Sequence, residues 1–392
     1  QRFGYMIEVS RILVSEKLEN KALRHKRSEG SAPVVVWCTT KRCNLDCMHC
    51  YSGGNTASDG ELSTDEAKRM LDGLKDCGSP FMILSGGEPF LRADVFELGR
   101  YAREIGLMVI VSSNGTIVTP EIAAKAADAG FGYVGVSLDG LAETNNYFRG
   151  SGDAYSNALQ GMRNLRDAGI KTGLRFTMTR HNCHELPEIM DLLVEEGFHR
   201  LCVYHLEYAG RGKELMDNDL SPEERRRAVD SLFRKTVEIN SHNHGLEVLT
   251  VGNYADAAYI YMKVLKEDPQ KAEAAYEHFL RNGGEGCGEK LAYIDEVGNV
   301  YASQHLKTEL GNIRERSLKD IWNSKNEFLW KLRNRESLFR GKCAECRFLE
   351  ICRGGSRARA LAVYDDFGAP DPSCYLTKEE ILEPVQEEVQ HD

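Results

Sequence analysis

The chain has 392 residues, a length that suggests two or three domains or one large barrel with an appendage. Hydrophobic residues make up 42% and charged residues 28%, which excludes a long disordered, collagen-like or membrane-embedded chain. The formal net charge of -10 argues against binding along a nucleic-acid backbone. Twelve cysteines exceed what packing alone requires and indicate metal or redox chemistry.

The N-terminal segment, residues 1–32, carries basic residues between apolar ones and has no signal-peptide core. We therefore expect a surface helix there and a cytoplasmic protein. The longest apolar runs, such as Val34 to Cys38, are far shorter than the roughly 20 residues of a membrane span. The sequence predicts no membrane insertion.

Residues 33–245 alternate short apolar, β-branched runs with amphipathic helical windows, which is typical of βαβ units around a parallel sheet. The expected strands are Val34–Cys38, Phe81–Leu84, Met108–Ser112, Tyr133–Ser137, Thr172–Met178 and Leu201–Leu206. The expected helices are Thr64–Cys77, Ala93–Ile105, Pro120–Ala129, Ala154–Ala168, Leu186–Glu196 and Pro222–Asn240. Six such units predict an α/β fold, a partial (β/α)6 barrel of the TIM type.

The rest of the chain divides into two expected parts. Residues 246–284 read as a helical linker region, in which Leu246–Val251 precedes a charged helical stretch, Tyr254–Asn282. Residues 285–392 form a cysteine-rich C-terminal domain that begins with a hairpin, Ala292–Ile294 and Val300–Ala302.

The first cysteine cluster lies directly after the first expected strand, where Cys43, Cys47 and Cys50 follow a Cys-x3-Cys-x2-Cys pattern. Three thiolates can hold three irons of a [4Fe-4S] cluster and leave the fourth iron open to an external ligand. A zinc site with one missing ligand and a chance grouping are the alternatives. A position at the carboxyl end of a barrel strand favours the functional interpretation.

This loop resembles the signature of the radical S-adenosylmethionine (AdoMet) superfamily, and further motifs match it in order along the chain. Ser85 to Pro89 are similar to the GGEP motif, which implies AdoMet contacts by Gly86, Gly87, Glu88 and Pro89. The strand-end segments that follow imply further cofactor contacts by Ser113, Asn114, Ser137, Asp139 and Arg175. His49 is expected to pack near the adenine and not to ligate iron.

The second cluster consists of Cys343, Cys346, Cys352 and Cys374, four thiolates that could close a [4Fe-4S] cluster or bind a structural zinc. Beside the barrel motifs it resembles the SPASM domain of radical AdoMet enzymes, a twitch-like iron-sulfur extension. The full SPASM pattern holds two auxiliary clusters, but here Ser303 and Ser356 occupy two of its later positions. We therefore predict one auxiliary cluster, two [4Fe-4S] clusters in all, and a spare thiol at Cys287.

Four cysteines lie outside both clusters and have no partner spacing. Cys38 and Cys202 fall on expected strands, Cys77 ends an expected helix and Cys183 precedes one. Buried, unreactive thiols are the simplest interpretation of all four.

Segments such as Pro33 to Trp37, Tyr204 to Leu206 and Ala369 to Thr377 resemble the radical AdoMet enzymes that modify tetrapyrroles in haem and haem d1 biosynthesis. The resemblance is strongest to didecarboxysiroheme deacetylase and implies removal of acetate side chains by a 5′-deoxyadenosyl radical, with a ferredoxin- or flavodoxin-type electron donor. A carboxylated substrate needs cations, and the candidates are Arg149, Arg175, Arg211 and Lys213. Imidazole suits iron, so His205 and His305 are candidate axial ligands, with a satisfied or solvated histidine as the simpler alternative.

Three other functions are compatible with parts of the pattern. The segment Tyr301 to Leu306 departs from the deacetylase pattern, which leaves iron-coproporphyrin oxidative decarboxylase as an alternative. A radical AdoMet peptide or cofactor maturase usually has a longer N-terminal region than the segment that precedes Val34 here. A simple electron-transfer protein would not need the GGEP-like turn.

Overall fold

The computed structural model describes residues 6–15, 32–53 and 58–382. Within them, eleven strands form one sheet, in the order β1-β8-β7-β6-β5-β4-β3-β2-β9-β10-β11. The strands are β1 (Ile7–Glu8), β2 (Val34–Cys38), β3 (Met82–Ser85), β4 (Val109–Ser113), β5 (Tyr133–Ser137), β6 (Thr172–Met178), β7 (Arg200–His205), β8 (Glu247–Val251), β9 (Leu291–Ile294), β10 (Asn299–Tyr301) and β11 (Glu309–Asn312).

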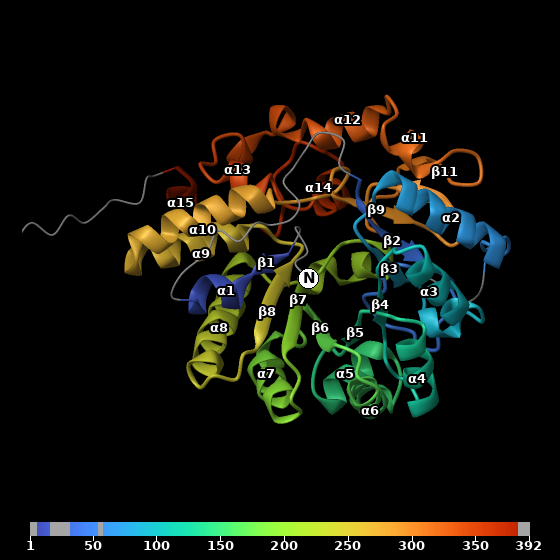
Figure 1. Cartoon of the computed structure of the whole chain (residues 1–392). Helices are drawn as coiled ribbons and strands as arrows, with labels where there is room; N and C mark the ends of the chain where they lie inside the picture. Colours follow the sequence, from blue (N-terminus) through green and yellow to red (C-terminus); the bar gives the residue numbers. More distant parts are fainter. Residues whose placement is uncertain (1–5, 16–31, 54–57, 383–392) are drawn as a thin grey trace, which may run out of the picture.

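Strands β2 to β8 run parallel, and helices follow them on the outer face of the sheet (Figure 1). The helices of this part are α1 (Val9–Val14), α2 (Thr64–Cys77), α3 (Val95–Glu104), α4 (Pro120–Asp128), α5 (Ala142–Arg149), α6 (Ala154–Asp167), α7 (Leu186–Glu195) and α8 (Pro222–Ser241). Short 3-10 helices are η1 (Pro89–Leu91), η2 (Cys183–Glu185) and η3 (Gly210–Asn218). The predicted open, partial barrel is confirmed.

Side chains alternate between the two faces of the barrel strands, as the pleat requires. On β2, Val35 and Trp37 pack outward against the helices, while Val34, Val36 and Cys38 belong to a second apolar cluster on the inner face. That inner cluster also holds residues of β3, β4, β5, β7, β8 and β9. The inner face is thus apolar at its base, and polar side chains gather beyond the strand ends.

The sheet extends beyond the six predicted β/α units at both edges. Strand β8, which the sequence placed in the linker region, pairs in parallel with β7 and adds a seventh parallel strand. At the other edge β9 pairs in parallel with β2, and β10 and β11 continue as an antiparallel meander. The C-terminal domain therefore shares the sheet of the barrel and covers the β2 edge, while β1 covers the β8 edge.

One local expectation needs correction. The segment 1–32 was expected to form a surface helix, but within residues 6–15 β1 pairs with β8, and Val9 and Ile12 of α1 are fully buried. The rest of residues 1–32 lies outside the described residues, apart from residue 32. The expected helical stretch 254–282 is helical, as α9 (Ala255–Glu267) and α10 (Pro269–Asn282), and Asp268 caps the second helix, which begins with Pro269.

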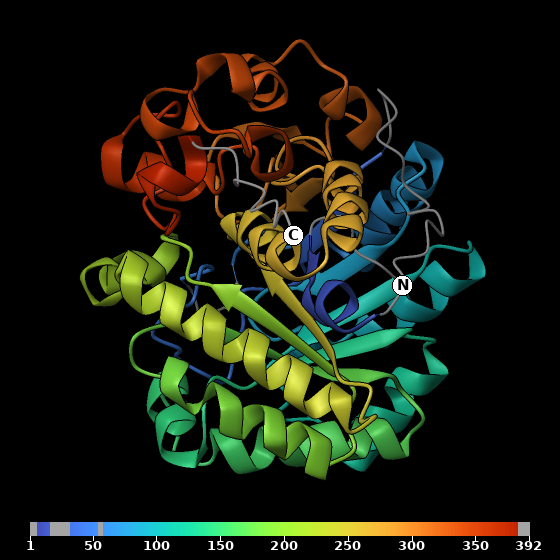
Figure 2. The same ribbon diagram turned by 90° about the vertical axis from the view of Figure 1, so that its left-hand side faces the viewer.

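The C-terminal elements lie across one end of the barrel, as Figure 2 shows most clearly. The predicted hairpin is confirmed as β9 and β10. The helices of this part are α11 (Leu318–Trp322), α12 (Glu327–Arg333), α13 (Leu349–Cys352), α14 (Arg357–Tyr364) and α15 (Lys378–Leu382), with η4 (Arg335–Leu338) and η5 (Gly341–Cys343) between them.

Candidate functional site

The cysteine loop after β2 gathers its three thiols at one place. Cys43, Cys47 and Cys50 pack in one small apolar cluster with Leu45 and Ala154. The pKa of Cys43 is raised to about 11, chiefly by burial and in smaller part by the neighbouring Glu88, Cys47 and Cys50. Thiols gathered in this way are placed to share one positively charged inorganic cluster.

Two arginines hold this loop from behind. Arg149 at the end of α5 is buried, pairs with Asp139, and places a guanidinium nitrogen 3.6 Å from the sulfur of Cys47. Arg211 in η3 donates to the backbone oxygen of Cys47 at 2.8 Å, and its own backbone N–H donates to that of Cys50 at 3.0 Å. The positions of both arginines therefore give them a role in shaping the cluster loop.

The glycine pair after β3 packs against the backbone that leads into the loop. Gly87 N–H donates to the oxygen of Thr40 at 2.8 Å, and Glu88 N–H donates to that of Arg42 at 2.7 Å. A Cβ on Gly87 would lie 2.1 Å from the oxygen of Arg42, so only glycine fits. The close approach expected between this turn and a ligand is, in the structure, an approach to residues 40–42.

Glu88 is fully buried and collects three donors: Ser113 Oγ at 2.9 Å, Asn114 N–H at 2.8 Å and Phe90 N–H at 3.2 Å. Burial raises its pKa to about 7. The Asn114 amide in turn lies 3.8 Å from the sulfur of Cys43. The structure thus brings Glu88, Ser113 and Asn114, three predicted cofactor contacts from two loops, together beside the first cysteine of the loop.

Asp139, at the end of β5, is also fully buried. Its carboxylate accepts from Thr177 N–H at 2.6 Å, pairs with Arg149, and lies 3.6 Å from the His49 ring. The His49 ring stacks on Phe148 at 4.6 Å between centroids, and burial lowers its pKa to about 4. His49 is therefore neutral and lies on the Asp139 side of the loop.

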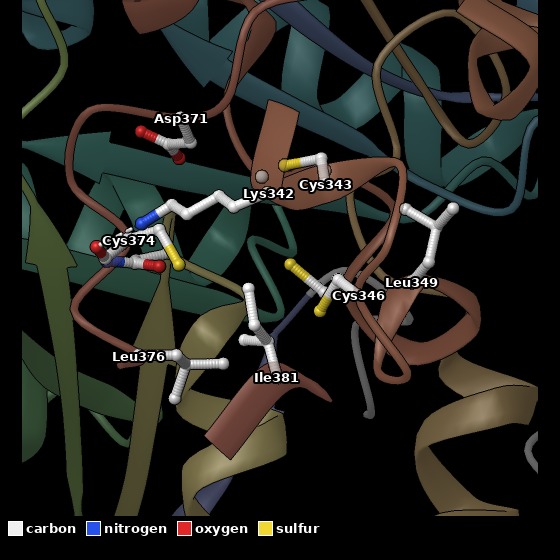
Figure 3. A pocket seen from close by; sticks show the side chains of 12 residues that line it. Lys342, Cys343, Cys346, Leu349, Asp371, Cys374, Leu376 and Ile381 are labelled. Atoms are coloured by element: carbon white, nitrogen blue, oxygen red, sulfur yellow. Dashed lines mark hydrogen bonds between the residues drawn. The ribbon is translucent and has the colours of Figure 1, made fainter. Parts of the chain in front are cut away.

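The four C-terminal cysteines line one small cavity together with Leu349, Leu376 and Ile381. Figure 3 shows Cys343, Cys346 and Cys374 turned toward the same space. Burial raises the pKa of all four thiols, and Cys374 raises that of each of the other three. The sequence prediction that these cysteines meet is confirmed.

Four thiols around one cavity are a suitable ligand set for a closed [4Fe-4S] cluster, with one thiolate for each iron. A structural zinc ion would use the same number of thiolates.

Between the barrel and the C-terminal domain lies a cleft with an empty volume of about 920 Å³. Its barrel side includes Tyr51, Arg175 on β6 and Tyr204 on β7, and Arg175 stacks over the Tyr204 ring at 4.7 Å. Its other side includes Cys287, Ser303 and Ser356. The two positions at which the sequence departs from the two-cluster SPASM pattern, Ser303 and Ser356, thus meet the spare thiol Cys287 in the wall of this cleft.

The predicted substrate residues divide into two sets. Arg175, His205 and His305 line the cleft. Arg149 and Arg211 contact the cysteine loop instead, and Lys213 is exposed on η3. We expected Arg149, Arg211 and Lys213 to face the same substrate pocket as Arg175, but none of the three lines the cleft. The end of α5 and η3 pack against the cysteine loop instead.

The two candidate iron ligands differ in availability. His205 Nε2 lies 2.9 Å from Asp256 Oδ2 and its Nδ1 lies 3.0 Å from the Arg225 guanidinium, so both ring nitrogens are engaged. His205 is thus the satisfied histidine of the simpler alternative. His305 meets Tyr51 edge-on at 5.7 Å, and burial lowers its pKa to about 3, which keeps its ring neutral.

Sequence reasoning missed several residues of the cleft. Tyr51 directly follows Cys50 and hydrogen bonds with Ser85 at 2.8 Å, while Glu207 lies two residues after the end of β7. The rule that functional residues follow the carboxyl ends of barrel strands could have found both. Glu285 lies in a glycine-rich loop before β9, and nothing in its local sequence marks it.

Of the cysteines outside the clusters, Cys38 and Cys202 are buried on the inner face of the sheet, as expected. Cys77 and Cys183 are half-buried. No helix of the described residues is long and apolar enough to cross a bilayer.

Comparisons with known families agree with this geometry. The family model described as the Radical SAM superfamily matches residues 37–193, and the one described as an iron-sulfur cluster-binding domain, SPASM, matches residues 287–347. The first covers β2 to α7, and the second begins at Cys287 and includes Cys343 and Cys346.

Two curated relatives match over nearly the whole chain. Fe-coproporphyrin III synthase of Methanosarcina barkeri is 44% identical, over 94% of this chain and 93% of the relative. Pre-heme d1 synthase of Dinoroseobacter shibae is 38% identical, over 89% of this chain and 87% of the relative.

A solved structure confirms the fold. SuiB of Streptococcus suis bound to S-adenosylmethionine superposes with a TM-score of 0.68 at 19% identity, over 88% of this chain and 78% of that one.

Proposed function

Because the chain belongs to the radical SAM superfamily and uses AdoMet with [4Fe-4S] clusters, we propose that it removes acetate side chains from didecarboxysiroheme, an iron tetrapyrrole. Two relatives named for steps of haem and haem d1 synthesis, at 44% and 38% identity, support this substrate class. Oxidative decarboxylation of iron-coproporphyrin is the alternative reaction of the same class.

The cleft between the barrel and the C-terminal domain is the observation that carries the proposal. The cleft and the solvent-open space before it amount to about 920 Å³, and the cleft opens beside Tyr51, next to the cysteine loop. Tyr51 and Tyr204 offer aromatic surface to a flat ring system, and Arg175 offers a guanidinium to its carboxylates. A flat, carboxylated substrate meets complementary groups in this cleft.

Cys43, Cys47 and Cys50 would hold three irons of the first cluster, and AdoMet would bind at the fourth. The segment Gly86 to Pro89 with Ser113 and Asn114, and Ser137, Asp139 and Arg175 beyond them, are the proposed AdoMet contacts. Glu88 accepts three hydrogen bonds already, and a carboxylate with about four acceptor sites retains room for an ammonium. When bound, the cluster and AdoMet supply a 5′-deoxyadenosyl radical for hydrogen abstraction.

The C-terminal domain would contribute the second cluster and the far wall of the cleft. The second cluster would have one thiolate for each iron, from Cys343, Cys346, Cys352 and Cys374. No iron would then be open to an outside ligand, which suits a cluster that transfers electrons. His305 faces the cleft with a neutral ring and is the proposed contact for the tetrapyrrole iron.

Anaerobic reconstitution with AdoMet, dithionite and didecarboxysiroheme, followed by mass spectrometry of the tetrapyrrole, tests the reaction. We expect loss of two acetate side chains, coupled to formation of 5′-deoxyadenosine. Formation of 5′-deoxyadenosine without loss of acetate would contradict the deacetylase assignment but would remain consistent with a radical AdoMet enzyme. About eight irons per chain are expected from two clusters, and about twelve would contradict a single auxiliary cluster.

A further inference from the structure

Glu207 is a partly buried carboxyl group in the wall of the cleft, with 12% of its side chain exposed. It follows β7, so it belongs to the barrel, but its partners belong to the C-terminal domain. Ser356 Oγ donates to its Oε2 at 2.7 Å, and the Arg359 guanidinium donates to its Oε1 at 3.0 Å. Ser356 occupies one of the cysteine positions of the two-cluster SPASM pattern, and here its hydroxyl anchors a carboxyl group.

The cation beside Glu207, Arg359, also forms an ion pair with a second carboxylate, Asp371. Arg359 on α14 makes a two-pronged ion pair with Asp371, with nitrogen-oxygen distances of 2.9 and 2.6 Å. Asp371 also accepts from the backbone N–H groups of Ser356 at 2.7 Å and Ser373 at 3.0 Å. These contacts lower the pKa of Asp371. The single guanidinium of Arg359 is therefore shared by two carboxyl groups, and Asp371 is the one whose ionised form is better stabilised.

The remaining charged groups around Glu207 do not supply a second cation. Glu285 faces it from the loop before β9 and is neutralised by its own partner, Arg335, at 2.5 Å. The other titratable groups of the cleft wall are Arg175, which stacks on Tyr204, the histidines His205 and His305, the Cys287 thiol, and the phenols of Tyr51, Tyr204 and Tyr254. Burial, opposed by Arg359, raises the pKa of Glu207 to about 7.

We infer that Glu207 binds a carboxylate of the substrate as a neutral acid, donating the hydrogen bond, with Ser356 and Arg359 fixing its orientation. This inference rests on the proposed tetrapyrrole substrate. A neutral carboxyl group pairs with a carboxylate through one short hydrogen bond, whereas an ionised Glu207 would repel it. Glu207 thereby acts as a specificity residue that ties substrate binding to pH.

The test measures binding to the AdoMet-loaded holoenzyme without reductant, with Fe-coproporphyrin III as the probe and its absorbance as the signal. If only the neutral form binds, the apparent Kd rises as the neutral fraction falls. We expect about a tenfold weaker Kd at pH 8 than at pH 6 for the natural chain. Glu207→Gln keeps a neutral donor at every pH and should change less than about twofold over this range.

A matched control is Glu296→Gln, which alters a buried glutamate that pairs with Lys41 and is not among the residues that line the cleft. It should retain the tenfold dependence of the natural chain. An equal pH dependence in Glu207→Gln and in the natural chain would overturn the inference, because the titrating group would then lie elsewhere. A natural chain whose Kd does not change with pH would overturn it as well.

A second variant tests the same inference if Glu207→Gln does not assemble its clusters. Ser356→Ala removes a donor to the ionised form of Glu207, so the pH midpoint of binding should move upward. An unchanged midpoint would contradict the inference. Failure of the natural chain to bind the porphyrin at any pH would instead contradict the proposed substrate class itself, and this separates the two claims.

Discussion

The two cysteine sites are built in different ways. The four-thiol cavity takes its ligands from the segment between Cys343 and Cys374, and most of its apolar lining comes from the same domain. The three-thiol loop depends on distant parts of the chain, because residues 86–88, Asn114, Arg149 and Arg211 all contact it. A site that closes on itself can be built locally, whereas a site that must expose one iron needs a scaffold around it.

The charged groups around the two sites also differ in how far away in the sequence they lie. Beside the loop, Arg149 lies against a thiol and is held there by the fully buried Asp139. In the cavity, Lys342 donates to the backbone oxygen of Cys374 at 3.0 Å, and leucine and isoleucine side chains close the rest. The loop is therefore the more sensitive of the two to changes made far away in the sequence.

The largest contrast should come from removing one thiol at each site. Cys47→Ser removes one of only three ligands, so we expect formation of 5′-deoxyadenosine to fall by about 1000-fold or more, about 4 kcal/mol in the barrier. Quantitative mass spectrometry of the nucleoside checks this. Cleavage at more than a tenth of the natural rate would mean that Cys47 is not an essential ligand.

Cys374→Ser should have the opposite signature. It removes one ligand of the cavity, so iron should fall from about eight to about four per chain, while AdoMet cleavage in the absence of substrate persists. Iron analysis together with the nucleoside assay separates the two sites. If both variants lose AdoMet cleavage equally, the two clusters are not independent and the comparison fails.

Arg149→Met tests whether the loop depends on its scaffold. The change leaves the buried Asp139 without its ion pair, and we expect the free energy of unfolding to fall by about 3–5 kcal/mol. Urea denaturation under anaerobic conditions measures it. The double variant with Asp139→Asn removes both charges and should recover part of the loss; no recovery would assign the effect to packing.

Glu88 gives a smaller effect that depends on pH. Its pKa of about 7 is raised by burial, so above that pH its ionised form can pair with the ammonium of AdoMet. We expect the affinity for AdoMet to rise about tenfold from pH 6 to pH 8, and Glu88→Gln to remove this rise. Isothermal titration at several pH values measures it.

The sign of this dependence follows from the raised pKa. Without AdoMet, a carboxyl group with a raised pKa stabilises the fold at low pH, and this contribution is lost as the pH rises through about 7. When AdoMet is bound, its ammonium stabilises the ionised form of Glu88, so binding is favoured at high pH. The trend is opposite to that expected for Glu207 and the porphyrin, so a common trend for both ligands would contradict one of the two assignments.

Much of the fold and the candidate site could be predicted because the signals are local. Helical windows with capping residues, such as Ser63 before α2, gave helix positions that agree with the structure within a few residues. The motifs after β2 to β5 were expected to meet because parallel strands bring their carboxyl ends to one edge. The contacts of Glu88, Ser113 and Asn114 confirm that expectation for these three residues.

Other features could not be predicted because they depend on partners far away in the sequence. His205 reads as a candidate ligand until Asp256 and Arg225 occupy its two nitrogens. Arg149 reads as a surface cation until α5 directs it to Asp139 and Cys47. The linker assignment of residues 246–251 was wrong because the pairing of β8 with β7 has no local signature.

The sequence by itself determined the two sets of cysteines and the motifs beside the first, because thiol number and spacing decide which inorganic group a short segment can hold. Only the tertiary structure decided that Cys287, Ser303 and Ser356 share a cleft wall with Glu207. Burial and the competition of carboxyl groups for one guanidinium decide the charge of such a residue, and both arise only when distant segments pack together.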